Sequence, residues 1–160
     1  MFFAGHKNAK FAFIATLWEL SQNPQIQDKL YQEIAAHSPS LSKDNLKDLP
    51  YLIAVLSETL RLYPPVNQNT WGPTAHEYQP ERWGDNFHAI QRAISQQPVR
   101  GSYIPFNAWT RSCIGSEFAL LQLRVTLYEV VHYFEITSAP DYHYLIKEAS
   151  SNLQTCCDIY

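Results

Sequence analysis

The feature that most constrains the fold is an alternation of helically spaced apolar residues with proline-rich breaks. Apolar residues recur at helical spacing within residues 1–36, 50–62 and 113–134. Prolines separate these stretches, and a proline removes a backbone donor and ends a helix. Over residues 67–105 the periodicity is lost, and prolines, glycines and tryptophans there predict an irregular loop. The chain is therefore predicted to be mainly α, with little β, in a single domain.

Composition and charge exclude several classes of function. The 160 residues, of which 46% are hydrophobic, suffice for one core, and a net charge of −3 argues against a nucleic-acid partner. No run of about 20 apolar residues occurs, and the start at Met1 does not resemble a signal peptide, so we expect no membrane anchor in this chain. Cys113, Cys156 and Cys157 form no CxxC pair, which favours reduced thiols and an intracellular location.

Three short motifs follow one another along the chain. Glu58 and Arg61 lie three residues apart on a predicted helix, so both side chains project from the same face. Alone, this spacing most often marks a surface ion pair that contributes little to stability. Downstream come Pro80-Glu81-Arg82-Trp83 and a segment from Phe106 to Gly115 of pattern Phe-x-x-x-x-Arg-x-Cys-x-Gly, which leads directly into a predicted helix. The order of the three motifs carries more information than any one of them.

This ordered set resembles the signature of cytochrome P450, the haem-thiolate monooxygenase family, and in particular its C-terminal part. Ala4-Gly5-His6-Lys7-Asn8 lies where the oxygen-binding helix of the family carries Ala-Gly-x-acid-Thr. The resemblance implies a partial fold, whose parts we list by residue range. They are oxygen-side helices over 1–36, an EXXR helix over 50–62, a meander and haem loop over 71–112, a proximal helix over 113–134 and a divergent tail over 137–160.

The resemblance also implies roles for the residues of the haem loop. Cys113 would be the axial ligand of the iron of haem b, because a thiolate ligand supplies electron density that favours O–O cleavage. Arg111 would pair with a haem propionate, and Phe106 would shield the sulfur from water. Gly115 would allow close approach of the porphyrin. The alternatives are an inert buried cysteine, a solvated arginine and ordinary packing for Phe106 and Gly115.

Other positions are implied to support the fold or to depart from the family pattern. Glu58, Arg61 and Arg82 would form a buried charge network behind the haem loop. At the positions of the catalytic proton relay, Lys7 replaces an acid and Asn8 replaces a threonine, which reverses one charge and leaves an amide that can still bond an oxygen ligand. Trp109 stands where the family has a glycine, and between residues 69 and 72 a stretch of strands and a short helix is missing.

Three functions are compatible with this pattern. The first is a haem monooxygenase that inserts one atom of dioxygen into an apolar substrate, such as a fatty acid or an alkane, as in the fungal members that the motifs most resemble. Full-length relatives would receive electrons from an NADPH-cytochrome reductase and are often bound to the endoplasmic reticulum. The second is a catalytically inactive haem-loop fragment or helical remnant. The third is a helical interaction module without a cofactor, although apolar helix faces more often form a core.

Overall fold

The computed structural model describes residues 2–37, 45–63, 71–97, 99, 101–107, 110 and 112–138. In this part of the chain the elements are helices, so the prediction of a mainly α fold is confirmed. They are α1 (Phe2–Gln22), α2 (Pro24–Ala36), η1 (Asn45–Asp48), α3 (Pro50–Leu62), η2 (Pro80–Trp83), α4 (Phe87–Ser95) and α5 (Ser116–Tyr133), where η denotes a single 3-10 turn. Among the described helices, none has the length and apolar character needed to cross a lipid bilayer.

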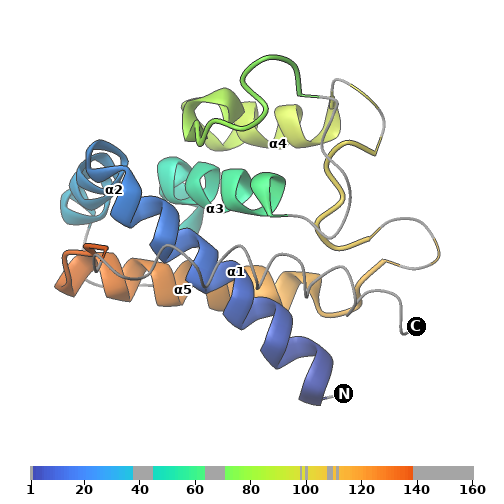
Figure 1. Cartoon of the computed structure of the whole chain (residues 1–160), viewed down its shortest axis with the longest axis horizontal. Helices are drawn as coiled ribbons and strands as arrows, with labels where there is room; N and C mark the ends of the chain where they lie inside the picture. The colour runs from blue at the N-terminus through green and yellow to red at the C-terminus, as the bar shows by residue number, and fades with distance from the viewer. Residues whose placement is uncertain are drawn as a thin grey trace.

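The helix α3 occupies the centre of the molecule. Figure 1 shows α4 along one side of α3, with α1 and α5 on the other side, where α1 crosses α5 at an angle. Every side chain from Tyr51 to Thr59 is buried, so α3 is enclosed on nearly all of its faces. A helix in such a position can carry polar side chains only if each of them finds a partner.

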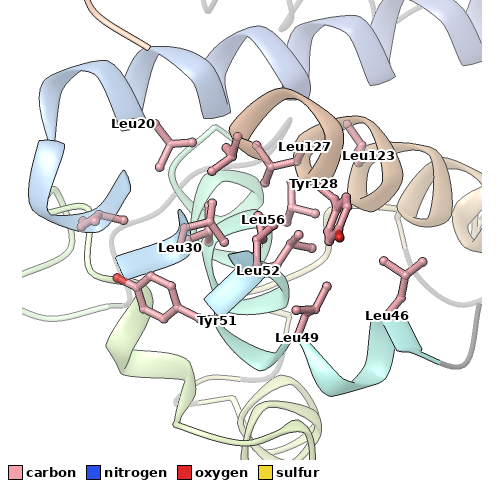
Figure 2. Close-up of a cluster of buried hydrophobic side chains, with 14 of the residues drawn as sticks. Leu20, Leu30, Leu46, Leu49, Tyr51, Leu52, Leu56, Leu123, Leu127 and Tyr128 are labelled. Atoms are coloured by element: carbon pink, nitrogen blue, oxygen red, sulfur yellow. The ribbon is translucent and has the colours of Figure 1, made fainter. Parts of the chain in front are cut away.

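Two apolar clusters surround α3. In the larger one, Leu52 and Leu56 of α3 meet Leu20 of α1, Leu30 of α2 and Leu127 of α5 (Figure 2). These five leucines are at most 2% exposed. Burial of each such side chain stabilises the fold by roughly 1.5–3 kcal/mol. This cluster holds four helices together and fixes the direction of α5.

The second cluster lies on the opposite side of α3 and contains most of the aromatic rings of the loop region. Ile53 and Ala54 of α3 pack there against Trp83 of η2, Ile90 of α4 and Tyr103. Trp83 and Ile90 are 1% and 0% exposed. The loop between α3 and α5 is therefore part of the core, although most of it forms no long helix.

The first turn of α3 is capped by a side chain from another helix. The carboxylate of Glu33 on α2 accepts hydrogen bonds from the backbone N–H groups of Tyr51 at 2.7 Å and Leu52 at 2.9 Å. Pro50 begins the helix and has no N–H, while Leu49 provides no side-chain cap. Burial raises the pKa of Glu33, and the two N–H donors oppose this rise by favouring the charged form. Glu33 thus satisfies donors that a helix start leaves without partners.

A short extended segment follows α5 and is fastened to α2 by one glutamine. The Gln27 amide donates to the Ile136 carbonyl at 2.9 Å, and the Ile136 N–H donates back to Gln27 Oε1 at 2.7 Å. The carboxamide therefore pairs with both backbone groups of one residue, as a neighbouring β-strand would.

Two sequence predictions need correction. The stretch over 67–105 is predicted to be irregular, but it contains α4, whose first turn is capped by the Asn86 side chain accepting from Ala89 N at 2.9 Å. Phe87, Ile90 and Ile94 do recur at helical spacing, but the helix is short and prolines flank it, so the sequence pattern did not predict it. The helix predicted over 113–134 begins at Ser116, three residues later than its predicted start, and Cys113 lies just before it, as the motif predicts.

Glu33→Ala should lower the free energy of unfolding by about 1–2 kcal/mol, because two N–H groups at the start of α3 lose their acceptor. Gln32→Ala is the matched control, since Gln32 is exposed on the same helix, and it should change the stability by less than about 0.5 kcal/mol. Urea unfolding followed by circular dichroism measures both. Equal losses in the two variants would show that the cap contributes nothing.

Candidate functional site

The carboxylate of Glu58 is the centre of a buried charge network. Glu58 and Arg61 lie one turn apart on α3 and are 0% and 1% exposed. Arg61 Nε donates to Glu58 Oε2 at 2.8 Å, and Arg61 Nη2 donates to Oε1 at 2.9 Å. Arg82 of η2 donates from Nε to Glu58 Oε1 at 2.8 Å. The structure thus brings together the three residues that the sequence motifs singled out.

Two further donors fill the remaining capacity of this carboxylate. The backbone N–H of Gln79 donates to Glu58 Oε1 at 2.9 Å, and the indole N–H of Trp83 donates to Oε2 at 3.0 Å. Five N–H groups therefore face one carboxylate, which is what a charge removed from water requires. The sequence reasoning did not assign Gln79 or Trp83 to the network. Their only signal was that both lie in or beside the Pro-Glu-Arg-Trp segment.

The two arginines also hold the loop that precedes η2. Arg61 Nη1 donates to the Ala75 carbonyl at 2.7 Å, and Arg61 Nη2 donates to the Glu77 carbonyl at 3.0 Å. Arg82 Nη2 donates to the Thr74 carbonyl at 3.0 Å. This loop forms no helix, and apart from two turn bonds, to the Gly72 and Thr74 carbonyls, its carbonyl groups take partners from elsewhere. The guanidinium groups provide these partners while both remain paired with Glu58.

A chain of aromatic contacts leads from Glu58 toward the loop that contains Cys113. The ring of Trp83 lies 4.7 Å, between centroids, from that of Tyr103, and the ring of Trp71 lies 5.6 Å from that of Trp83. Trp71 Nε1 donates to the Ser102 carbonyl at 3.1 Å. Burial raises the pKa of Tyr103, and a hydrogen bond with Ser57 on α3 opposes the rise, so this phenol is neutral. The chain from Ser102 to Tyr103 is thus fixed to the scaffold around α3.

Beyond Tyr103 the backbone folds back on itself to reach Cys113. Asn107 N donates to the Ile104 carbonyl at 3.1 Å, and Asn107 has a positive φ of 61°, a conformation that asparagine tolerates better than most residues. The Cys113 N–H then donates to the Phe106 carbonyl at 2.8 Å, which closes the loop. The Cys113 carbonyl accepts from Ser116 N at 3.3 Å, at the first residue of α5. The position of Cys113 is therefore set by its bond to Phe106 on one side and by its bond to the start of α5 on the other.

The surface around Cys113 is open and apolar. The thiol is free and exposed, and the large side chains of Ile114 and Phe118 are 90% and 72% exposed. A Cβ atom placed on Gly115 would meet only Cys113 Sγ, at 3.9 Å. A side chain at position 115 would therefore project into the space beside the sulfur. The thiol is thus accessible, and exposed apolar side chains follow it in the chain.

The structure does not bring all the predicted residues to this site. Lys7 and Asn8 are exposed on the N-terminal half of α1, which in Figure 1 extends past its crossing with α5. Arg111 and Trp109 lie outside the described residues, so their predicted roles are not tested. Phe106 is half-buried and contributes its carbonyl to the loop closure.

Comparisons with known proteins identify the family. The cytochrome P450 family model matches residues 1–70 and 67–153. The cytochrome P450 monooxygenase xanG of Aspergillus fumigatus is 32% identical over 97% of the chain, and cytochrome P450-DIT2 of Saccharomyces cerevisiae is 26% identical over 87%. The crystal structure of the cytochrome P450 CYP102L1 shares the fold, with a TM-score of 0.68 at 24% identity over 84% of the chain. The chain belongs to the cytochrome P450 family.

The matches also show how much of a relative the chain represents. It spans 36% of the length of the Aspergillus protein, 35% of the yeast protein and 37% of the crystal structure, about a third in each case. The alignment with the Aspergillus protein runs over 191 residues, more than the 160 of the chain, so that relative has residues that this chain lacks. The two parts of the family match meet at residues 67–70, where the sequence indicated a missing stretch.

The cytochrome P450 family is haem-dependent, so haem b is the cofactor that membership assigns to this chain. The described residues fit this group. A haem iron takes four ligands from the porphyrin and needs one sulfur from the protein, and Cys113 presents an exposed thiol. Ile114 and Phe118 are exposed apolar side chains that could contact a porphyrin, and among the described residues only Cys113 Sγ lies within 4 Å of a Cβ placed on Gly115.

Glu58→Gln should lower the free energy of unfolding by about 3–5 kcal/mol, because it keeps the shape of the side chain but leaves the buried guanidinium of Arg61 and the partly buried one of Arg82 without their counter-charge. The matched control is Glu81→Gln, which breaks the ion pair between Glu81 and Lys29. The Glu81 side chain is 53% exposed and the Lys29 side chain 52%. That change should cost less than about 1 kcal/mol. Chemical unfolding at pH 7 measures both, and similar small losses would mean that the Glu58 network is not what holds the loop.

Proposed function

We propose that the chain holds haem b with the thiolate of Cys113 as the axial ligand of the iron. The observation that carries the proposal is the exposed thiol of Cys113, placed just before α5 in a loop closed by its own N–H and the Phe106 carbonyl. The contacts of Glu58, Trp83 and Tyr103 support this loop from the protein side. A ligand residue that is held both by the loop closure and by these contacts with the scaffold keeps its position when the cofactor binds.

Each loop residue then has a defined task. When bound, haem supplies the iron centre at which dioxygen is activated. Cys113 provides a sulfur ligand that donates electron density to the iron, and Phe106 excludes water from the sulfur. Arg111 pairs with a propionate through its forked donors. Gly115 keeps the backbone at the start of α5 clear of the porphyrin.

For the whole protein we propose the activity of a haem monooxygenase. It would insert one atom of dioxygen into an apolar substrate such as a fatty acid or an alkane, with electrons from an NADPH-cytochrome reductase. Family membership supports the reaction class, and a fungal relative bears the name of a monooxygenase. The substrate class rests on motif resemblance alone. The division into oxygen-side helices, EXXR helix, meander and proximal helix follows the same proposal, and the intracellular location stays a prediction.

A second candidate function is a haem-binding chain that does not turn over substrate. Lys7 stands where the family has an acid and Asn8 where it has a threonine, and both side chains are exposed. Neither restores a carboxyl group and a hydroxyl that together could pass a proton. Supplying reductase and NADPH separates the two candidates, since an active enzyme forms hydroxylated product, whereas an inactive one consumes NADPH only to form peroxide.

Cys113→Ser should abolish the strongly red-shifted absorption band that a thiolate-ligated ferrous haem shows with carbon monoxide, because no other cysteine lies in this loop. Replacing Cys156 and Cys157 together with serine is the matched control, and the band should persist. The spectrum of reduced protein after incubation with haemin measures both. Loss of the band in the control, with retention in Cys113→Ser, would assign the ligand to the tail.

A further inference from the structure

One side chain makes a two-point contact with the backbone at the entrance of the Cys113 loop. The Gln97 amide donates to the Tyr103 carbonyl at 2.8 Å, and the Tyr103 N–H donates to Gln97 Oε1 at 2.9 Å. The same Gln97 amide also donates to the Ile94 carbonyl at 3.1 Å, in the last turn of α4. Gln97 therefore connects the end of α4 with the Tyr103 backbone at the entrance of the loop.

The position of Tyr103 matters because it lies close to the closure of the loop. Phe106, whose carbonyl accepts from the Cys113 N–H, follows Tyr103 by three residues, a reach of at most about 10 Å. The ring of Tyr103 is held by Trp83, but a ring contact fixes the side chain more than the backbone. The contact with Gln97 fixes both hydrogen-bonding groups of the Tyr103 backbone.

This contact links α3 to the backbone of the loop, whereas the other links from α3 reach the side chain of Tyr103. The side-chain links run from Glu58 through Trp83 to the ring of Tyr103, and from Ser57 to the Tyr103 hydroxyl. The backbone link runs through α4, because Ile90 packs in the same cluster as Ile53 of α3, and Gln97 lies two residues after that helix. Attachment of the backbone in addition to the side chain constrains both the place and the orientation of a peptide segment.

We propose that Gln97 is a positioning residue for Cys113. Its carboxamide holds the Tyr103 backbone in the orientation from which the chain reaches Phe106 and closes on the Cys113 N–H. The consequence for haem ligation rests on the proposed function, whereas the consequence for loop geometry does not. The simpler alternative is that Gln97 only completes the end of α4 and contributes to stability like any other side-chain contact.

The chain offers a matched control, because Gln27 makes the same two-point contact with Ile136, far from the loop. The experiment measures hydrogen exchange of the Cys113 amide in the 160-residue chain for Gln97→Ala and Gln27→Ala. Cys113 N bonds the Phe106 carbonyl and not Gln97, so only a shift of the loop exposes it. Rates are compared with those of α3 amides in the same sample, which corrects for a general loss of stability.

Gln97→Ala should accelerate exchange of the Cys113 amide about tenfold relative to α3, whereas Gln27→Ala should leave this ratio unchanged. Gln97→Glu should act as Gln97→Ala does, because it keeps the shape but loses the donor to the Tyr103 carbonyl. An unchanged ratio in both Gln97 variants, or equal changes in Gln97→Ala and Gln27→Ala, would overturn the proposal.

A second readout follows the haem itself. In Gln97→Ala a smaller share of the ferrous carbon monoxide complex should absorb at the thiolate position than in the parent or in Gln27→Ala. Full retention of the thiolate band in Gln97→Ala would contradict a role in placing Cys113. If the parent shows no thiolate band at all, the proposed function is wrong, and the exchange ratio alone then decides whether Gln97 positions the loop.

Discussion

The structure depends on a carboxylate that has been taken out of water. Glu58 is fully buried in α3, the helix around which the others pack, and its charge is tolerated because five N–H groups face it. Those donors come from α3 itself, from η2 and from the residue before η2, so the carboxylate can be satisfied only when the loop is folded against the helix. A half-formed network would be worse than none, since an unpaired buried charge costs several kcal/mol.

The same arrangement explains how an irregular segment can hold a ligand in a defined place. The loop between α3 and α5 has few backbone ladders of its own, and it is fixed instead through the guanidinium groups of Arg61 and Arg82, through the ring of Trp83 and through Gln97. Cys113 then lies between this anchored loop and α5, whose direction is fixed by the leucine cluster. The thiol of Cys113 can stay exposed because the side chains that hold its loop are buried elsewhere.

The sequence was sufficient to predict the parts of this arrangement in which residues recur at regular spacing. Apolar periodicity and the proline at its start were enough to place α3, and the three-residue separation put Glu58 and Arg61 on one face. It could not supply the other partners of Glu58, because the Gln79 donor is a backbone group and Trp83 reads as an ordinary apolar residue. It also missed α4, a short helix between prolines, and with it the contact between Gln97 and Tyr103. Contacts between loops and side chains have no period from which they could be predicted.

The central claim is that α3 and the loop form one cooperative unit around Glu58. Native-state hydrogen exchange tests it most directly, by following the Trp83 indole N–H and the Gln79 amide, both bonded to Glu58, as denaturant is added. The account predicts that both exchange only when α3 unfolds, with the same opening free energy and denaturant dependence as the Leu56 amide. Exchange of either group through a local opening with little denaturant dependence, while Leu56 stays protected, would contradict it.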